Sequence, residues 1–246
     1  MLTALFADIH ANREALDACL AHAERIAPDR YIFLGDYVGY GADPSYVLDL
    51  VQDYVARGAV ALRGNHDEAV VGSTAGMNDL ARAAIAWTRG ELNEAQRCFL
   101  AELPLTKQEG EHLFVHANAA APERWGYVTD RLEAARSLAA TRCHSIFCGH
   151  LHVPGVYYMA SNGALGEFTP VDGTPIPLLS DRRWLAVLGA VGQPRDRNPS
   201  ACYALLEEHK GELTYVRVAY DVMTAAAKIL DAGLPPPLAA RLVKGW

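Results

Sequence analysis

The sequence of 246 residues lacks both a paired-cysteine motif and a long apolar run. Its five cysteines are scattered, and their odd number fits free thiols in a reducing compartment better than a disulfide framework or a thiolate zinc site. The longest apolar run, near residues 185–191, is too short to cross a membrane. No basic region precedes the first apolar residues, which argues against a signal peptide. We therefore expect a cytoplasmic protein that has no membrane partner.

Positive charge is also scarce in this chain. Lysine and arginine together number 22 against 29 aspartates and glutamates, and the formal net charge is -7. This balance opposes a broad basic surface, so no stable nucleic-acid complex is expected. Hydrophobic residues make up 51% of the chain, and no repeat or low-complexity linker divides it. We therefore expect one α/β domain that spans residues 1–246.

Apolar patterning predicts strands that alternate with helices in the first 150 residues. The expected strands lie at residues 2–7, 31–34, 60–62, 113–115 and 145–148. The expected helices begin after Asn12 and at Pro44, where Asp43 is the expected capping carboxylate. Others cover most of residues 68–103 and run from Thr129 to about Ala140. After residue 153 the pattern predicts strands at 156–161, 164–168, 184–188, 201–206 and 213–219, then a last helix at 222–232 and a proline break at 235–237. This second half is expected to form an antiparallel or mixed sheet.

Polar side chains that can bind metals follow each of the five strands in the first part of the chain. They are Asp8 and His10, then Asp36, then Asn65 with His66 and Asp67, then His116, and finally His150 and His152. Residues two apart on an extended backbone share a face, so Asp8 and His10 can reach one point. Binding residues of α/β sheets collect beyond the carboxyl ends of the strands. The five strand ends are therefore expected to meet at one site.

Asp36 is the expected centre of that site. It follows an apolar strand and is surrounded by glycines, which let the backbone turn sharply beside a bound group. We expect an exposed carboxylate that bridges two metal ions. Imidazole, carboxylate and amide ligands suit Mn, Fe, Zn or Ni. Two divalent ions bring more positive charge than Asp8 and Asp36 cancel, so the site could bind a phosphate group and generate a metal-bound hydroxide nucleophile at neutral pH.

The order of these motifs resembles the calcineurin-like metallophosphoesterase superfamily. The motifs are Asp8-x-His10, Gly35-Asp36-x-Val38-x-x-Gly41, Gly64-Asn65-His66-Asp67, His116 and Gly149-His150-x-His152. Single pieces are weak signals, but five in order at fitting intervals are specific. The later segment from Gly192 to Asp196 resembles the small bacterial members, which include diadenosine tetraphosphatase-like proteins and other phosphodiesterases. The implied fold is a two-sheet β-sandwich of mixed strands flanked by helices, in αββα layers.

The resemblance also implies a role for each motif residue. Asp8, His10, Asp36 and His152 would hold one metal, and Asp36, Asn65, His116 and His150 the second. His66 would be the catalytic histidine that protonates the leaving oxygen or stabilises charge in the transition state. Asp67 would assist beside it. The implied reaction is hydrolysis of a phosphoester or phosphoanhydride bond in a small phosphorylated substrate, with a nucleotide as one option.

This chain departs from the family pattern in the loop after Asp36. Protein Ser/Thr phosphatases and the symmetrical dinucleotide tetraphosphatases usually carry an arginine, a phosphate contact, where this chain has Tyr40. Arg13, Arg63 and Arg195 are the candidate replacements, and Asn65 is a further candidate substrate contact.

Several alternatives stay open at this stage. Asp36 and Asn65 also suit ordinary turns, and Arg63 and Arg195 also suit surface ion pairs. Other functions compatible with the fold are a non-catalytic interaction scaffold, a Ser/Thr protein phosphatase and a nuclease acting on single strands.

Overall fold

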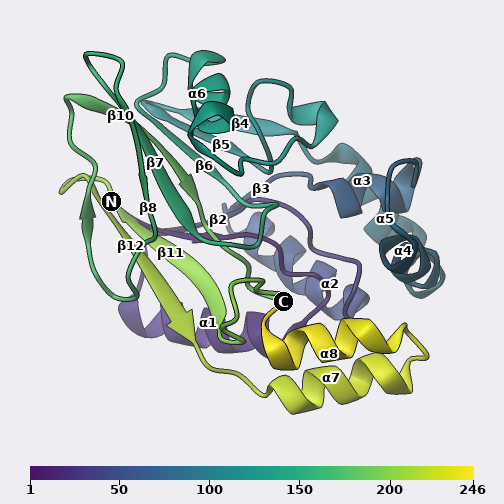
Figure 1. Ribbon diagram of the computed structural model, residues 1–246. Coiled ribbons are helices and arrows are strands. Elements are labelled where there is room, and N and C mark those ends of the chain that lie inside the picture. Colours follow the sequence, from purple (N-terminus) through teal and green to yellow (C-terminus); the bar gives the residue numbers. More distant parts are fainter.

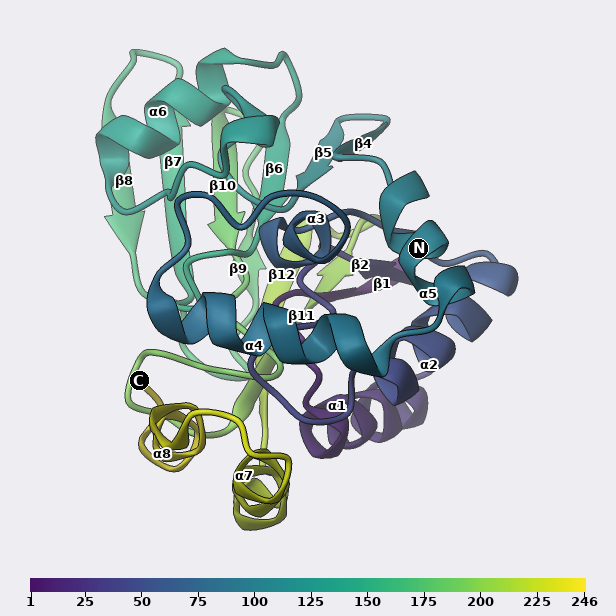
Figure 2. The ribbon, with the colours of Figure 1, turned by 90° about the vertical axis from the view of Figure 1, so that its right-hand side faces the viewer.

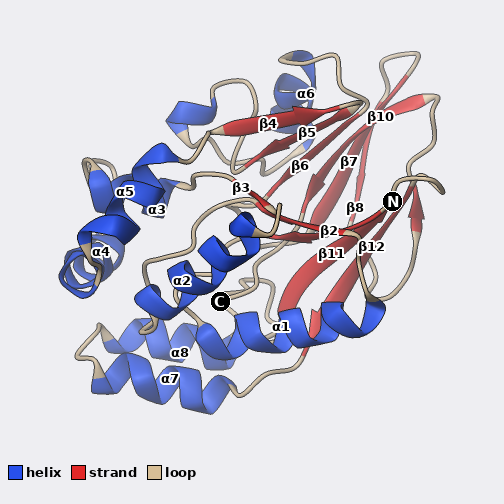
Figure 3. Ribbon diagram, turned by 180° about the vertical axis from the view of Figure 1, so that it is seen from behind, coloured by secondary structure: helices blue, strands red, loops and turns tan.

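The computed structural model describes all 246 residues and has two six-stranded sheets stacked face to face (Figure 1). Helices cover the outer faces of both sheets, as the view from behind also shows (Figure 3). The predicted two-sheet sandwich of mixed strands flanked by helices is therefore confirmed. None of the eight α-helices combines the length and the apolar composition that a membrane crossing requires.

The first sheet joins the two ends of the chain. Its strand order is β3-β2-β1-β11-β12-β9. The strands are β1 (Leu2–Phe6), β2 (Arg30–Phe33), β3 (Val60–Ala61), β9 (Ile176–Pro177), β11 (Ala201–Glu207) and β12 (Glu212–Val218). The strands β1, β2 and β3 are parallel, whereas β1 pairs antiparallel with β11.

The second sheet is formed by the middle of the chain. Its strand order is β4-β5-β6-β10-β7-β8. The strands are β4 (Thr106–Glu109), β5 (His112–Val115), β6 (Ser145–Cys148), β7 (Gly155–Ala160), β8 (Leu165–Phe168) and β10 (Arg182–Val187). Here β5, β6 and β10 are parallel, and the remaining pairs are antiparallel. Both sheets are thus mixed.

The alternating direction of side chains along the strands explains how both faces of each sheet are covered. In β1, Leu5 faces the other sheet, whereas Ala4 and Phe6 face the helices, because successive side chains point to opposite faces. The inter-sheet core also contains Phe114 and Phe147, which stack with ring centroids 5.4 Å apart. Each sheet therefore has one apolar face for its partner sheet and one for helices.

The helices form groups around this sandwich (Figure 2). They are α1 (Arg13–Ile26), α2 (Pro44–Ala56), α3 (Asn65–Val71), α4 (Asp79–Glu91), α5 (Glu94–Glu102), a short 3-10 helix η1 (Pro122–Arg124), α6 (Arg131–Ala139), α7 (Val222–Asp231) and α8 (Pro236–Lys244). The helices α1 and α2 pack on the first sheet and α6 packs on the second. The helices α7 and α8 lie side by side (Figure 2) and pack against α4.

Three local predictions needed correction. The proline run at 235–237 does not end the ordered chain, because Pro236 begins α8, where a missing N–H costs no hydrogen bond. The strands β4 and β9 were not predicted, since one is almost wholly polar and the other has two residues. The carboxylate of Asp43 does not cap α2 but accepts a hydrogen bond from Lys228 on α7 at 2.9 Å.

The predicted convergence of strand ends is present. The carboxyl ends of β1, β2 and β3 in one sheet and of β5 and β6 in the other lead into loops that meet at one edge of the sandwich. The residues of this edge form the candidate site.

Candidate metal centre

Left-handed turns aim the candidate ligands at the strand ends. Five of them have positive φ: Asp8 (56°), His10 (50°), Asp36 (56°), His150 (66°) and His152 (63°). This conformation is uncommon for residues other than glycine because it costs conformational free energy. Residues that adopt it are often found at functional sites. Because each turn follows directly on a strand, the strand fixes where the side chain starts and the turn fixes where it points.

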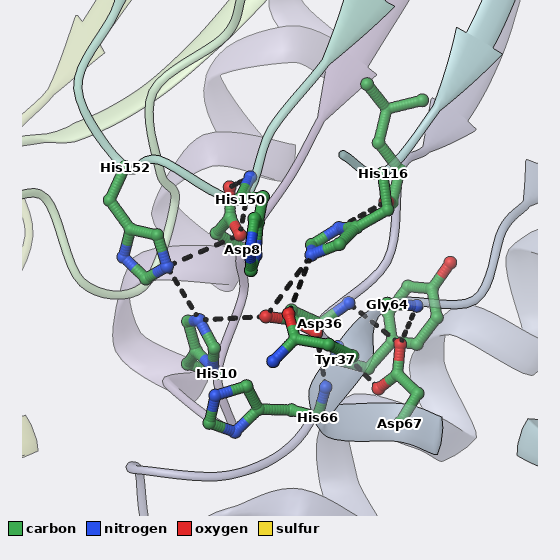
Figure 4. A network of polar contacts seen from close by, with 12 residues as sticks. Asp8, His10, Asp36, Tyr37, Gly64, His66, Asp67, His116, His150 and His152 are labelled. Atoms are coloured by element: carbon green, nitrogen blue, oxygen red, sulfur yellow. Dashed lines mark hydrogen bonds and ion pairs between the residues drawn. The ribbon is translucent and has the colours of Figure 1, made fainter. Parts of the chain in front are cut away.

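Backbone carbonyls orient three of the four histidine rings. In each ring Nδ1 donates its hydrogen to a carbonyl oxygen, so Nε2 carries a lone pair whenever the ring is neutral. The pairs are His10 with Val38 at 3.1 Å, His116 with Leu34 at 2.8 Å, and His152 with Gln193 at 2.7 Å. All three Nε2 atoms face the same small volume, as Figure 4 shows. The protein therefore presents Nε2 of His10 and His152 as metal ligands, and Nε2 of His116 becomes one when its proton is displaced.

The side chains form two groups that share one residue. Asp8, His10, Asp36 and His152 form the first, and Asp36, His116 and His150 form the second, with the ligand atoms of each group within 4.8 Å of one another. Asp36 Oδ2 lies 3.5 Å from His10 Nε2 and 3.4 Å from His116 Nε2. One carboxylate oxygen thus lies between the two groups, in the position that a shared ligand needs.

Asn65 belongs to the second group by position. Its Oδ1 lies 3.2 Å from His116 Nε2, and the residue is the first of α3, directly after the end of β3. A neutral amide oxygen next to an imidazole lone pair offers two acceptors to one point. The second group therefore has four oxygen or nitrogen atoms suited to a divalent cation.

The donor atoms fit metal ions. His10 Nε2 and His152 Nε2 lie only 3.1 Å apart, and both carry lone pairs because their Nδ1 hydrogens are already donated. Two facing lone pairs repel unless a cation or a proton lies between them. Burial lowers the pKa of both rings well below the usual value for histidine, which disfavours the proton. His150 Nε2 is also buried without a hydrogen-bond partner.

Two carboxylates are buried with these rings. Asp36 is only 1% exposed, so the expectation that it is exposed was wrong, and Asp8 is fully buried. Burial raises the pKa of Asp8 to about 7. Burial also opposes ionisation of Asp36, but His116 and neighbouring histidines hold its pKa well below the usual range. Two carboxylates buried among imidazole ligands call for a cation beside them.

Asp67 supports the site from behind and does not face it. Its carboxylate accepts hydrogen bonds from the backbone N–H groups of Asp36 and Gly64 at 2.8 Å each and of Tyr37 at 2.9 Å (Figure 4). Both oxygens are therefore engaged with the turn that carries Asp36. These contacts are those of a residue that holds the turn in place, and the catalytic role of Asp67 stays a prediction.

His66 lies beside the two groups but contributes to neither (Figure 4). Its backbone N–H donates to Asp36 Oδ1 at 2.8 Å, and burial lowers the pKa of its ring to about 4. Its Nδ1 is buried without a partner and lies against Gly39, where a Cβ atom would come within 2.4 Å of it. The glycine at that position is needed for this close approach.

A cleft with a volume of about 290 Å³ opens beside the two groups. Of the three predicted arginines only Arg195 lines it. Arg63 instead donates to Leu103 O at 2.8 Å and pairs with Glu68 at 2.7 Å, so it holds backbone together. Arg13 is half-exposed, pairs with Asp17 and lies over the Tyr46 ring. The structure therefore does not support Arg13 or Arg63 as substrate contacts.

Tyr40, at the position of the family arginine, packs within the site. Its ring centroid is 4.7 Å from that of His10 and 4.4 Å from that of His66, and the Arg195 guanidinium lies 5.7 Å from it. Tyr37, in contrast, is fully buried and donates to the Leu62 carbonyl at 2.8 Å. Of these two tyrosines, only Tyr40 lines the cleft.

Sequence reasoning missed the outer walls of the cleft. One wall is formed by Arg124, Trp125 and Tyr127, and the other by residues 73–78 between α3 and α4. The only feature of the sequence that could have indicated these walls is their position, because each segment follows a strand end that carries candidate ligands.

The sequence and the fold of this chain are similar to those of several known proteins. The profile of the calcineurin-like phosphoesterase superfamily domain matches residues 1–211. An uncharacterised protein from Methanocaldococcus jannaschii is 34% identical over 99% of this chain and 98% of its own length. A metallophosphoesterase from Sphaerobacter thermophilus is 34% identical, has a TM-score of 0.88, and is matched over 100% of this chain and 99% of its own. A protein of Pyrococcus horikoshii shares the fold at 19% identity, with a TM-score of 0.80, and the match covers 100% and 98% of the two chains.

Proposed function

This chain belongs to the calcineurin-like phosphoesterase superfamily, and on that premise we propose that it hydrolyses phosphoester or phosphoanhydride bonds at a two-metal centre. The proposed substrate is a small phosphorylated molecule, with a phosphodiester or a dinucleoside polyphosphate as the leading classes. One observation carries the proposal: Asp36 Oδ2 lies between His10 Nε2 and His116 Nε2, so two groups of buried ligands share a carboxylate.

Each ligand residue has a defined part in this proposal. Asp8, His10, Asp36 and His152 would hold one ion, and Asp36, Asn65, His116 and His150 the other. Divalent ions such as Mn, Fe, Zn or Ni would, when bound, polarise the phosphate and activate a water molecule. The carbonyl contacts of the histidines would keep their Nε2 lone pairs on the ions.

His66 is the proposed hydrogen-bond donor to the leaving oxygen. Burial lowers its pKa to about 4, so the ring is neutral near pH 7 and carries one N–H. It lines the cleft next to the shared carboxylate without being part of either ligand group. A neutral imidazole at that place can donate a hydrogen bond as charge develops on the leaving group.

Arg195 is the proposed phosphate contact. It lines the cleft, its Nη2 donates to Gln193 Oε1 at 2.9 Å, and its Nε is buried without a partner. A half-buried guanidinium with an unused N–H favours an anion as its partner. Arg195 would supply the positive charge that the Ser/Thr protein phosphatases and the symmetrical dinucleotide tetraphosphatases usually carry on an arginine at the position of Tyr40.

The decisive experiment changes the shared carboxylate. Asp36→Asn should lose most of the bound metal, measured by elemental analysis after gel filtration, and should lower hydrolysis by at least about 100-fold, because the amide cannot bridge two cations. Asp17→Asn is the control, since Asp17 lies on α1 and pairs only on the surface. Two tightly held ions and full hydrolysis in Asp36→Asn would overturn the bridging role.

A substrate panel with added Mn would define the reaction. The panel compares a phosphomonoester, a bis-aryl phosphodiester, a cyclic nucleotide and a dinucleoside tetraphosphate. We expect a preference for the diester or the tetraphosphate. The rival scaffold function predicts no hydrolysis of any of the four by the metal-loaded protein.

A further inference from the structure

The cleft is larger than a phosphate group at the metal centre requires, and its outer part has a different chemistry. Next to the ligands it is lined by His66, Arg195 and the candidate metal ligands. The cleft is also lined by Trp125, Tyr127 and Met77, by small residues of the loop before α4, and by one charged side chain of each sign, Arg124 and Glu68. A phosphate bound at the centre would therefore carry its organic group into a space that offers aromatic and apolar surface.

Two aromatic side chains of one segment contact the second ligand group from the cleft side. The Tyr127 ring stacks on His150 with centroids 4.1 Å apart and an interplanar angle of 11°. The Trp125 ring meets His116 edge-on, with centroids 5.9 Å apart. Tyr127 nevertheless keeps 49% of its surface exposed, and Trp125 is only partly buried. Packing on the histidines thus leaves aromatic surface free in the cleft.

The opposite wall suits a flat partner. Between α3 and α4 the chain contributes Ala75, Gly76 and Met77 to the cleft, and only the methionine is large. Asn78 also lines this wall; its Oδ1 caps α4 by accepting from Ala81 N–H at 3.0 Å, so its amide NH₂ remains available. A thioether, small side chains and an amide donor leave room for a planar ring with polar edges.

We propose that this outer part of the cleft, the base slot, binds the nucleobase of a nucleoside phosphate. The base would lie along Trp125, with Met77 and Asn78 on the opposite side. The slot is defined by Trp125, Tyr127, Ala75, Gly76, Met77 and Asn78. The proposal rests on the proposed function, because the phosphate is taken to occupy the metal centre. A nucleotide fits better than an aryl phosphate, since a base has polar edges for the free amide of Asn78, which a phenyl ring lacks.

Equilibrium binding to the Mn-loaded protein tests the slot without hydrolysis. The matched ligands are adenosine 5'-monophosphate and ribose 5-phosphate, which differ only in the base, with phenyl phosphate as a third. Calorimetry should give at least about tenfold tighter binding of the nucleotide than of the sugar phosphate, because a base stacked on an aromatic side chain contributes on that scale. Phenyl phosphate should bind no better than the sugar phosphate.

Two variants separate base contact from support of the histidine. Trp125→Ala should weaken nucleotide binding about tenfold and change sugar phosphate binding less than twofold, whereas Trp125→Phe should keep most of the nucleotide affinity. Trp246→Ala, which changes an exposed tryptophan at the C-terminus, should leave both affinities unchanged. The metal content of each variant is measured in parallel.

Two results would overturn the base slot. One is equal affinity of the wild type for the nucleotide and the sugar phosphate, including no binding of either. The other is an equal loss of both in Trp125→Ala, which would mean that Trp125 only supports His116. A protein that prefers the nucleotide but hydrolyses nothing would keep the slot and reject the proposed hydrolysis.

Discussion

At the scale of residues, the candidate ligands are oriented by the backbone. The rings of His10, His116 and His152 each donate to a carbonyl oxygen, and Asp8 accepts two contacts from the backbone N–H of His150, at 2.9 and 3.1 Å. Main-chain groups cannot be exchanged by point mutation. The geometry of the site therefore depends on the turns more than on neighbouring side chains, and substitutions around it should be tolerated if they keep those turns.

His66 allows the role of a single side chain to be tested. His66→Ala should lower turnover by about 100- to 10,000-fold, the usual contribution of a positioned acid–base group, while metal content stays at the wild-type level. Steady-state kinetics and elemental analysis measure the two effects. His22→Ala is the control, because His22 contacts Tyr203 on the far side of the first sheet from the cleft. A parallel loss of metal would instead make His66 a ligand.

His116 makes metal binding depend on pH. Burial alone would lower its pKa, but the charge of Asp36 and the hydrogen bond that the ring donates to this carboxylate raise the pKa to about 9 in the metal-free protein. The ring is thus protonated at pH 7.5, and a cation must displace that proton to bind Nε2. Metal affinity should therefore increase with pH up to about 9, with about one proton released per second-group ion.

Calorimetry measures directly the release of protons that accompanies metal binding. Mn titrations at pH 7.5 in two buffers with different ionisation enthalpies should give different apparent heats, and the difference gives the number of protons. At pH 10 the difference should vanish, because the ring is already neutral. Identical heats at pH 7.5 would contradict a protonated His116.

At the scale of elements, the least predictable part was the C-terminal helix pair. Three consecutive prolines indicated a break, yet Pro236 and Pro237 occupy the first turn of α8, the one place in a helix that tolerates proline. The pair packs against Tyr40 and Ala84. It also holds the segment after Arg195, because Arg197 N–H donates to Gly245 O at 2.7 Å. An element outside the matched residues 1–211 thus supports two residues of the cleft.

This support predicts a measurable contribution to stability. Leu238, on α8, is fully buried in that cluster, and Leu238→Ala should lower the free energy of unfolding by about 2–5 kcal/mol because it leaves a cavity. Leu230 on α7 is 51% exposed, so Leu230→Ala should change the free energy of unfolding by less than about 0.5 kcal/mol. Urea denaturation gives both values. Similar losses in the two variants would mean that the helix pair is not packed as described.

The sequence predicted the strands that carry the site and most of the helices, for a physical reason. Buried strands are short apolar runs, and each was followed by polar residues that, taken together and in order, indicated one site. The cleft walls were not predictable in the same way, because Trp125 and Met77 acquire their places only through tertiary packing. Burial of Asp36 was misjudged because a glycine-rich loop suggests exposure, whereas here histidines from the other sheet cover it.

At the scale of the whole molecule, the two ligand groups join the two sheets. Asp8, His10 and Asp36 follow strands of the first sheet, whereas His116 and His150 follow strands of the second. Ions that bind the folded protein stabilise it by mass action, by about 2.7 kcal/mol when free metal is 100 times the dissociation constant. The sandwich should therefore be least stable when stripped of metal.

Metal removal tests this at the level of thermal unfolding. Treatment with EDTA should lower the Tm by about 5–10 °C, given that 1 kcal/mol shifts a protein of this size by about 2–4 °C. Differential scanning calorimetry measures the shift, and added Mn should restore it. Asp36→Asn is the control, because a variant without the shared ligand should not respond to EDTA. An unchanged Tm for the wild type would argue against metals that connect the sheets.

The pairing of β1 with β11 sets the order of events during synthesis. Leu2 pairs with Glu207, and His10 meets His152 across 142 positions of sequence. A nascent chain therefore makes β1 early but cannot enclose it until nearly all of the sequence has left the ribosome. Such distant contacts make folding slow and keep the first sheet open meanwhile. A ribosome-bound chain that ends before residue 150 lacks two of the histidines, so a translating chain should not capture metal at the complete site.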